Sequence, residues 1–251
     1  MNISNKEKAL LLACAFVLVL FLGGVLLFIR QHGDAKTTTG PARRTFGALQ
    51  LVSSPTATPI FSDNFSDNSQ NWDVGTEAKY GSTINNGTLT MTEANHKPFR
   101  EPLPSNSVYD DASVAVTITL LQGDQNDSVG LYLRANGSTG QGYYVDIYGD
   151  DTYDIAKITV DAAQKVHAKY LAEPQHSSAL HSKGQKNNVL VITKGATIVL
   201  LINDTVVKSV SDGEFASGKT MLFVENGNSS SGVMASFDAI AVYAAPEHLP
   251  S

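Results

Sequence analysis

The stretch SVGLYLRANGSTGQGYYVDIY, residues 128–148, contains two short runs in which every second side chain is apolar. The runs cover residues 128–135 and 143–148, and the segment between them contains Asn-Gly, a common turn signal. Side chains of a β-strand alternate between its two faces, so this spacing places the apolar residues of each run on one side. The stretch therefore predicts two strands of an antiparallel sheet, each with one buried face.

The same pattern continues through most of the chain. Further alternating or continuously apolar runs cover residues 114–122, 188–194, 197–203, 205–210, 220–225 and 233–243. Turn-forming pairs such as Asn86-Gly87, Lys194-Gly195 and Asn203-Asp204 lie between runs. Outside one apolar segment near the N-terminus, no stretch keeps a helical period for more than two turns. About a dozen short strands with such turns predict an all-β, two-sheet antiparallel jelly-roll sandwich.

Several segments also carry a family resemblance. In chain order they are FSDNFSDNSQNW (61–72), INNGTLTM (84–91), ASVAVTITLLQGDQNDSVGLYLRA (112–135), YYVDIY (143–148), NNVLVITKGATIVLLINDTVVKSV (187–210) and MASFDAIAVY (234–243). This set resembles the concanavalin A-like jelly rolls, which are grouped with laminin G-like domains and the 3-keto-disaccharide hydrolase family. The resemblance implies a jelly roll over residues 60–245 and a function in carbohydrate binding or hydrolysis. It determines the fold better than the chemistry, because one fold hosts many functions.

An apolar segment precedes this domain. Residues 9–29 are uncharged and mostly apolar, and they follow a short tail, residues 1–8. A helix of 21 such residues spans the ~30 Å hydrocarbon core of a bilayer. A cleaved signal peptide is the alternative, but its apolar region is shorter, ~7–15 residues, and Arg30 follows this segment directly. The sequence therefore favours a single-pass transmembrane helix.

Residues 30–59 are rich in Thr, Ser, Pro, Gly and Ala and show little periodicity. Such a composition predicts a flexible stalk between the membrane and the domain. Basic residues on both sides of the apolar segment leave the orientation open under the positive-inside rule. The stalk-like composition favours a plasma-membrane protein whose C-terminal domain lies outside the cytoplasm. Residues 246–251 are predicted to form a short C-terminal tail.

Charge and cysteine content exclude several classes of function. Residues 60–251 carry twelve Lys and Arg against twenty-two Asp and Glu. An acidic domain argues against nucleic-acid binding, which needs a basic face. The one cysteine, Cys14, lies in the apolar segment, so the predicted domain has neither disulfides nor a cysteine nucleophile. We expect a monomeric domain whose partners are the membrane and a glycan or cell-surface ligand.

The run at residues 143–148 supplies the first candidate site. Because Val145 and Ile147 share one parity, Tyr144, Asp146 and Tyr148 point to the other face. Tyrosine rings stack on the C–H faces of sugars, and carboxylates accept hydrogen bonds from hydroxyl groups. This face is therefore either a sugar-binding surface or the ordinary solvated side of a sheet.

Neighbouring strands extend this face. By the same alternation Tyr132 and Arg134 point outward from the preceding strand, and Tyr153 and Lys157 from the following one. On a merely solvated face Arg134 and Asp146 would form a cross-strand pair, and on a sugar-binding face they would orient the sugar together. The candidate ligand-binding residues are Tyr132, Arg134, Tyr144, Asp146, Tyr148 and Lys157.

A hydrolase needs a second carboxylate near the first. The resemblance includes the jelly-roll glucanases, which place their catalytic carboxylates on one strand in the pattern Glu-x-Asp-x-x-Glu. The matching strand here contains Asp146 alone, and Asp150, Asp151 and Asp154 are expected in the following turn. The sequence therefore assigns no catalytic residue. Glycoside hydrolysis of the 3-keto-disaccharide type and a protein-contact or sensor ectodomain remain as alternatives to carbohydrate binding.

A structural calcium ion is a further expectation that rests on the resemblance, because jelly-roll modules often join their first and last strands through an ion. Asp63, in the entry turn, and Asp238, in the closing strand, are the candidate metal ligands. Calcium takes six or more oxygen ligands, so backbone carbonyl groups would have to complete the site. The histidines show no metal-binding spacing, and the sequence requires no other cofactor.

Overall fold

The computed structural model describes residues 57–227 and 231–250. These residues form an all-β structure of strands, turns and irregular loops without a helix, as the alternating runs predict. The predicted transmembrane helix and almost all of the predicted stalk lie outside the described residues. Within the described part, no helix is long and apolar enough to cross a membrane.

The larger of two sheets has nine strands in the order β13-β12-β11-β6-β15-β4-β3-β2, with β1 paired to β15. Its strands are β1 (Phe61–Asp63), β2 (Gly75–Thr76), β3 (Tyr80–Asn85), β4 (Thr88–Glu93), β6 (Ala112–Gln122), β11 (Asn187–Lys194), β12 (Thr197–Ile202), β13 (Thr205–Ser211) and β15 (Val233–Ala244). All of its pairs are antiparallel.

The smaller sheet has six strands in the order β10-β9-β8-β7-β14-β5, again all antiparallel. They are β5 (Pro98–Pro102), β7 (Ser128–Ala135), β8 (Gly142–Tyr148), β9 (Thr152–Val160), β10 (Val166–His176) and β14 (Lys219–Glu225). The opening stretch of the sequence thus forms β7 and β8, which pair in the register Tyr132↔Tyr144 and Gly130↔Asp146.

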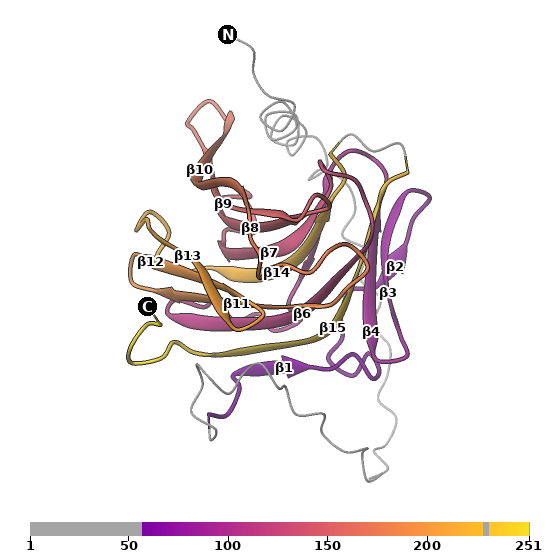
Figure 1. Cartoon of the computed structure of the whole chain (residues 1–251), viewed down its shortest axis with the longest axis horizontal. Coiled ribbons are helices and arrows are strands. Elements are labelled where there is room, and N and C mark those ends of the chain that lie inside the picture. The colour runs from indigo at the N-terminus through magenta and orange to yellow at the C-terminus, as the bar shows by residue number, and fades with distance from the viewer. Residues whose placement is uncertain (1–56, 228–230, 251) are drawn as a thin grey trace.

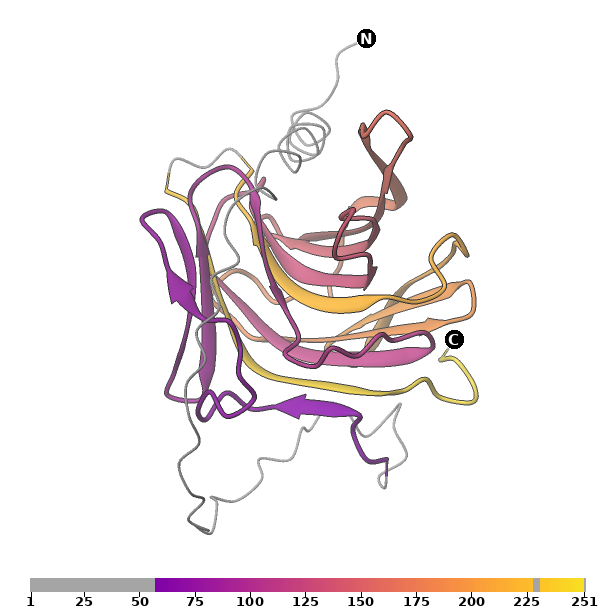
Figure 2. The same ribbon diagram turned by 180° about the vertical axis from the view of Figure 1, so that it is seen from behind.

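The sheets pack face to face and bend in the same direction, and the six-stranded sheet lies on the inside of the bend (Figures 1 and 2). The main core fills the space between them. Leu131 and Val145 of the smaller sheet and Val116, Phe237 and Ile240 of the larger one are buried there. The two-sheet sandwich predicted from the alternation is confirmed. Phe237 and Ile240 differ in parity, and both reach the core because a register shift between Phe237 and Ala239 interrupts the alternation of β15.

The turn between β8 and β9 fixes how these strands pair. Residues 149–151 connect Tyr148 to Thr152, and Asp151 adopts a left-handed conformation with φ of 61°. A Cβ atom on Gly149 would lie 2.3 Å from the backbone oxygen of Asp124, so only glycine fits here. Since this three-residue turn sets the register, Asp146 faces Asp154 directly and Ile147 faces Tyr153.

The C-terminal residues pack on the outer face of the nine-stranded sheet. Ala245 and Leu249 contact an apolar cluster that includes Ile192 and Val199. The ammonium group of Lys194 donates to the backbone oxygen of Pro246 at 2.8 Å. These contacts hold the end of the chain against β11 and β12, on the side of the molecule opposite to the six-stranded sheet.

Candidate functional site

The six-stranded sheet has a second face that points away from the main core, on the inside of the bend (Figure 2). We call it the concave face. Its polar and aromatic residues come from all six strands and are Arg100 (β5), Phe223 and Glu225 (β14), Ser128 and Tyr132 (β7), Tyr144, Asp146 and Tyr148 (β8), Asp154 (β9) and Tyr170 (β10).

An arginine and two tyrosines form one half of this face. The rings of Tyr132 and Tyr144 stack with their centroids 4.2 Å apart, and the ring of Phe223 meets Tyr144 edge-on at 5.0 Å. The guanidinium of Arg100 lies 5.4 Å from both tyrosine centroids, and its Nε donates to the Tyr144 hydroxyl at 2.7 Å. This combines a cation–π contact with a charged hydrogen bond, so it holds Arg100 in one position. Burial raises the pKa of Tyr144, which keeps its hydroxyl protonated.

Carboxyl groups form the other half. Asp146 and Asp154 are direct cross-strand partners, and their exposed fractions are only 5% and 0%. The hydroxyl of Ser128 donates to Asp146 at 2.7 Å, and the hydroxyl of Tyr148 donates to Asp154 at 2.9 Å. The register places the two carboxyl groups directly opposite each other on β8 and β9. Two buried carboxylates at such positions repel each other, so a proton bound by the pair lowers its energy.

The electrostatics of the face agree with this geometry. Burial raises the pKa of Asp146 to about 6, although the Ser128 hydroxyl and the charge of Arg100 oppose the shift. Burial, followed by repulsion from Asp146, raises the pKa of Glu225 to about 8. Both carboxyl groups therefore bind protons more strongly than they would in water, because one arginine does not neutralise three carboxyl groups.

Four of the six residues predicted to bind ligand do lie together on this face: Tyr132, Tyr144, Asp146 and Tyr148. Their exposure differs from the prediction, because Tyr132 and Tyr144 are only 1% and 5% exposed. Their ring faces are covered by each other and by Arg100, so neither ring offers an open stacking surface.

The predicted pair of Arg134 with Asp146 is wrong. Arg134 has a φ of 49° next to a register shift between β14 and β7, and this bulge turns its side chain toward the end of the sandwich. There its guanidinium donates to the backbone oxygens of Asp110 (3.0 Å), Gly195 (2.8 Å) and Phe215 (2.9 Å). With an exposed fraction of 3%, Arg134 holds three loops together away from the concave face.

The predicted orientation of Lys157 is also wrong. Lys157 pairs with Tyr143 in the register and therefore lies on the side of β9 that faces the other sheet. Its ammonium group contacts Asp212 at 2.5 Å and Glu214 at 2.6 Å, and Tyr143 donates to the same Asp212. These contacts close one end of the sandwich. Tyr153 points inward as well and donates to the backbone oxygen of Val207.

The two candidate calcium ligands have protein partners. Asp63 accepts hydrogen bonds from the backbone of Phe65 at 2.8 Å and from the indole of Trp72 at 2.6 Å, which fixes the entry turn. One oxygen of Asp238 lies 2.7 Å from the ammonium group of Lys186. Among residues 57–227 and 231–250, no group of three or more His, Cys, Asp or Glu is placed to hold a metal ion. Calcium at these two residues stays a prediction.

Six residues of the concave face were not predicted from the sequence, and the charged ones among them are Arg100, Asp154 and Glu225. Glu225 had a usable signal, because Met221, Phe223 and Glu225 share one parity in its strand. Asp154 was assigned to the turn, although it lies two residues inside β9. Arg100 lies on an edge strand between two prolines, where the local pattern gives no indication of the face.

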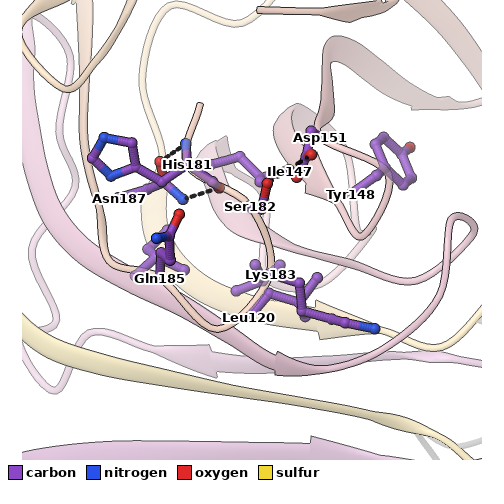
Figure 3. A pocket seen from close by; sticks show the side chains of 11 residues that line it. Leu120, Ile147, Tyr148, Asp151, His181, Ser182, Lys183, Gln185 and Asn187 are labelled. Atoms are coloured by element: carbon purple, nitrogen blue, oxygen red, sulfur yellow. Dashed lines mark hydrogen bonds between the residues drawn. The ribbon is translucent and has the colours of Figure 1, made fainter. Parts of the chain in front are cut away.

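A small pocket opens at one end of the sandwich, and Tyr148 of the concave face is among the residues that line it (Figure 3). Its walls are apolar side chains from between the sheets, such as Leu120 and Ile147, and its mouth carries His181, Ser182 and Lys183. Ser182 donates to Asp151 at 3.0 Å, and Lys183 donates to the backbone of Gly123 at 2.7 Å, so these groups brace a loop. The pocket has room for about one water molecule, which excludes a sugar ring.

Comparison with solved structures identifies the fold. A glycoside hydrolase family 16 enzyme of a mixed-linkage glucan locus from Bacteroides ovatus aligns with a TM-score of 0.54 at 10% identity, over 73% of this chain and 99% of that one. The kappa-carrageenase of Pseudoalteromonas carrageenovora aligns with a TM-score of 0.53 at 12% identity, over 77% and 98%. The fold is a concanavalin A-like jelly roll. A protein of unknown function with a galectin-like fold from Bacillus subtilis aligns similarly, with a TM-score of 0.53 at 13% identity over 76% and 97%. No protein-family model and no curated protein matches the sequence.

The position of Arg134 leads to a stability prediction. Replacing Arg134 with Ala removes the donors from three backbone oxygens, and each buried acceptor left without a donor costs ~1–3 kcal/mol. We expect Arg134→Ala to lower the free energy of unfolding by more than about 3 kcal/mol in urea titrations. Arg134→Lys should recover part of this loss. Lys169→Ala, at an exposed position of β10, serves as the control and should change stability by less than ~0.5 kcal/mol. A mild effect of Arg134→Ala would contradict the structural role.

Proposed function

We propose that this chain is a membrane-anchored protein whose jelly-roll domain binds a carbohydrate on the concave face. The observation that carries the proposal is the arrangement of polar groups there. Arg100, Tyr148, Tyr170 and Glu225 are half-buried, and they stand around the buried carboxyl pair and the stacked tyrosines. Such groups offer both donors and acceptors to sugar hydroxyls. The fold supports this choice of ligand, because the carrageenase and the Bacteroides ovatus enzyme are described in complex with oligosaccharides.

The proposed contacts are polar, in contrast to the stacking expected from the sequence. The Arg100 guanidinium is held by Tyr144 and by the stacked rings, which leaves it ordered before a ligand arrives. An ordered donor loses little entropy on binding and therefore favours a specific ligand. Tyr148 donates its hydroxyl hydrogen bond to Asp154 and is itself half-buried.

Glycan binding should depend on this layer. We expect Arg100→Ala and Glu225→Ala to weaken binding of residues 57–251 to a glycan found on an array by ~1–3 kcal/mol each, since each removes a polar partner of the sugar. Isothermal titration calorimetry measures the loss, and circular dichroism checks that each variant folds. Tyr243→Phe, on the outer face of the nine-stranded sheet, is the matched control and should bind normally. Binding of no glycan by the wild type would favour the alternative of a protein-contact ectodomain.

Glycoside hydrolysis is the second candidate, and one observation favours it. Glu225 has its pKa raised to about 8, so it carries a proton at neutral pH, as a general acid must. The Asp146–Asp154 pair supplies further carboxyl groups on the same face. Glycosidases combine one protonated and one ionised carboxyl group in this way. The 3-keto-disaccharide type of hydrolase, suggested by the sequence resemblance, belongs to this candidate.

Turnover distinguishes the two candidates. If the domain is a hydrolase, reducing sugar should accumulate when it is incubated with disaccharides and β-glucans. Glu225→Gln should then lower kcat by at least ~100-fold, the usual contribution of a general acid, with a smaller effect on KM. Lys169→Ala should leave turnover unchanged. Glycan binding without any turnover would favour carbohydrate binding over glycoside hydrolysis as the function of the domain.

The membrane anchor and the location are also part of the proposal. They rest on the composition of residues 9–29 and 30–59, which supports a single-pass helix in the plasma membrane and a stalk outside the cytoplasm. Protease added to intact cells should release the domain by cutting within residues 31–59, because such a stalk offers extended backbone to the enzyme. Immunoblotting of the medium measures the release. Cleavage only after lysis would place the domain on the cytoplasmic side.

A further inference from the structure

The two carboxyl groups of Asp146 and Asp154 meet across the centre of the six-stranded sheet. The register places the residues directly opposite each other on β8 and β9, and both side chains are at least nine-tenths buried. Like charges directly opposite each other destabilise a sheet, and the repulsion grows as water is excluded. The pair is therefore stable only when something other than solvent compensates one of its charges.

The hydroxyl donors around the pair do not provide that compensation. Ser128 and Tyr148 each donate one hydrogen bond, the first to Asp146 and the second to Asp154. Each aspartate thus accepts one hydrogen bond from a neutral hydroxyl group, and neither hydroxyl removes the repulsion between the two opposed carboxylates. One bound proton halves the charge of the pair.

Within residues 57–227 and 231–250, Arg100 is the cation that compensates the charge of the pair. The titratable groups that face it or act on its neighbours are Arg100 from β5, Glu225 from β14, Tyr132 from β7, Tyr144 and Tyr148 from β8 and Tyr170 from β10, with Glu93 and Asp127 near Glu225. Arg100 is shared among Tyr144, Asp146 and Glu225. Loss of the proton would leave two adjacent negative charges on a face that already carries Glu225.

We propose that the Asp146–Asp154 pair is a proton-dependent latch in the six-stranded sheet. With one proton bound, the two carboxyl groups hold β8 against β9 beneath the concave face. When the proton leaves to solvent, repulsion between the carboxylates weakens this contact and loosens the β9–β10 hairpin, which projects from the edge of the sheet (Figure 1). The concave face is therefore fully ordered below neutral pH, where the pair holds its proton. The latch does not depend on carbohydrate binding.

The direction of the pH dependence follows from the pKa values. The pKa of Asp146 is raised from 3.8 to about 6 in the folded state. The folded protein therefore holds this proton more tightly than the unfolded chain does. The stabilisation is fully present below about pH 4 and is lost as the pH rises through about 6. Burial raises the pKa of Glu101 to about 7 and that of Glu225 to about 8, so both groups shift stability in the same direction. A variant of one member of the pair is therefore needed to separate its contribution to the pH dependence of stability from those of Glu101 and Glu225.

The test is Asp154→Asn, with Asp204→Asn in an exposed turn as the matched control. Asparagine keeps the shape and the hydrogen-bonding capacity of a protonated aspartate but cannot ionise. Urea unfolding of residues 57–251 should give a higher midpoint than wild type at pH 8, and this advantage should disappear at pH 5. Asp204→Asn should shift the midpoint by the same small amount at both values. An equal loss of stability for Asp154→Asn at pH 5 and pH 8 would show a hydrogen-bonding role only and would overturn the latch.

A second measurement covers the case in which Asp154→Asn fails to fold. Hydrogen exchange of the wild-type domain, corrected for the intrinsic pH dependence of amide exchange, should show protection factors in β8, β9 and β10 that fall between pH 5 and pH 8. Strands β11 and β12, in the other sheet, provide the internal reference and should keep their protection. Protection that falls equally in both sheets, or in neither, would overturn the proposal.

Discussion

The burial of three carboxyl groups beside one arginine is the constraint on which the concave face depends. Asp146 and Asp154 occupy the neighbouring strands β8 and β9, Glu225 lies on β14 beyond β7, and Arg100 is a cation that acts on Asp146 and Glu225. A buried carboxylate without compensation costs several kcal/mol, so the face has to supply hydroxyl donors, a shared proton or the arginine to each group. The stacked rings of Tyr132 and Tyr144 contribute to this compensation, because they hold the Arg100 guanidinium near the carboxyl groups, where its positive charge acts on them.

The alternation of the sequence correctly assigned the faces of β7 and β8, but it failed at β9 for a definite reason. A two-residue turn after Tyr148 would place Tyr153 and Lys157 on the concave face. The actual turn has three residues and ends in the left-handed conformation of Asp151, so every side chain of β9 faces the other way. The third residue of the turn therefore has two consequences. Lys157 lies at the end of the sandwich, and Asp154 lies opposite Asp146. A bulge had the same effect on Arg134, whose pattern gave no sign of it.

Local pattern gives the parity of Glu225 within its strand, but it does not show which strands lie beside it, and it gives no signal for Arg100. Arg100 and Glu225 reach the concave face because β5 and β14 pair with each other and β14 pairs with β7, although residues 136–218 separate β7 from β14 in the sequence. Such neighbours are decided by the strand order of the jelly roll. The order in turn follows from how the two sheets share one core, which is a property of the whole chain. The fold was therefore predictable from alternation and turns, while the composition of the site was only half predictable.

The concave face has two layers that differ in burial, and the alternation of the sequence does not distinguish them. The lower layer, with Tyr132, Asp146 and Asp154, is buried, and its two carboxyl groups accept hydrogen bonds from Ser128 and Tyr148, so changes in it act mainly on stability. The upper layer, with Arg100, Tyr148 and Glu225, is only half-buried and is the part that an external molecule can meet. Charge couples the layers, since Asp146 acts on the proton of Glu225 and Arg100 acts on both. A molecule that changes the charge of the upper layer must therefore also change how tightly the buried pair holds its proton, and so how firmly β8 and β9 are joined.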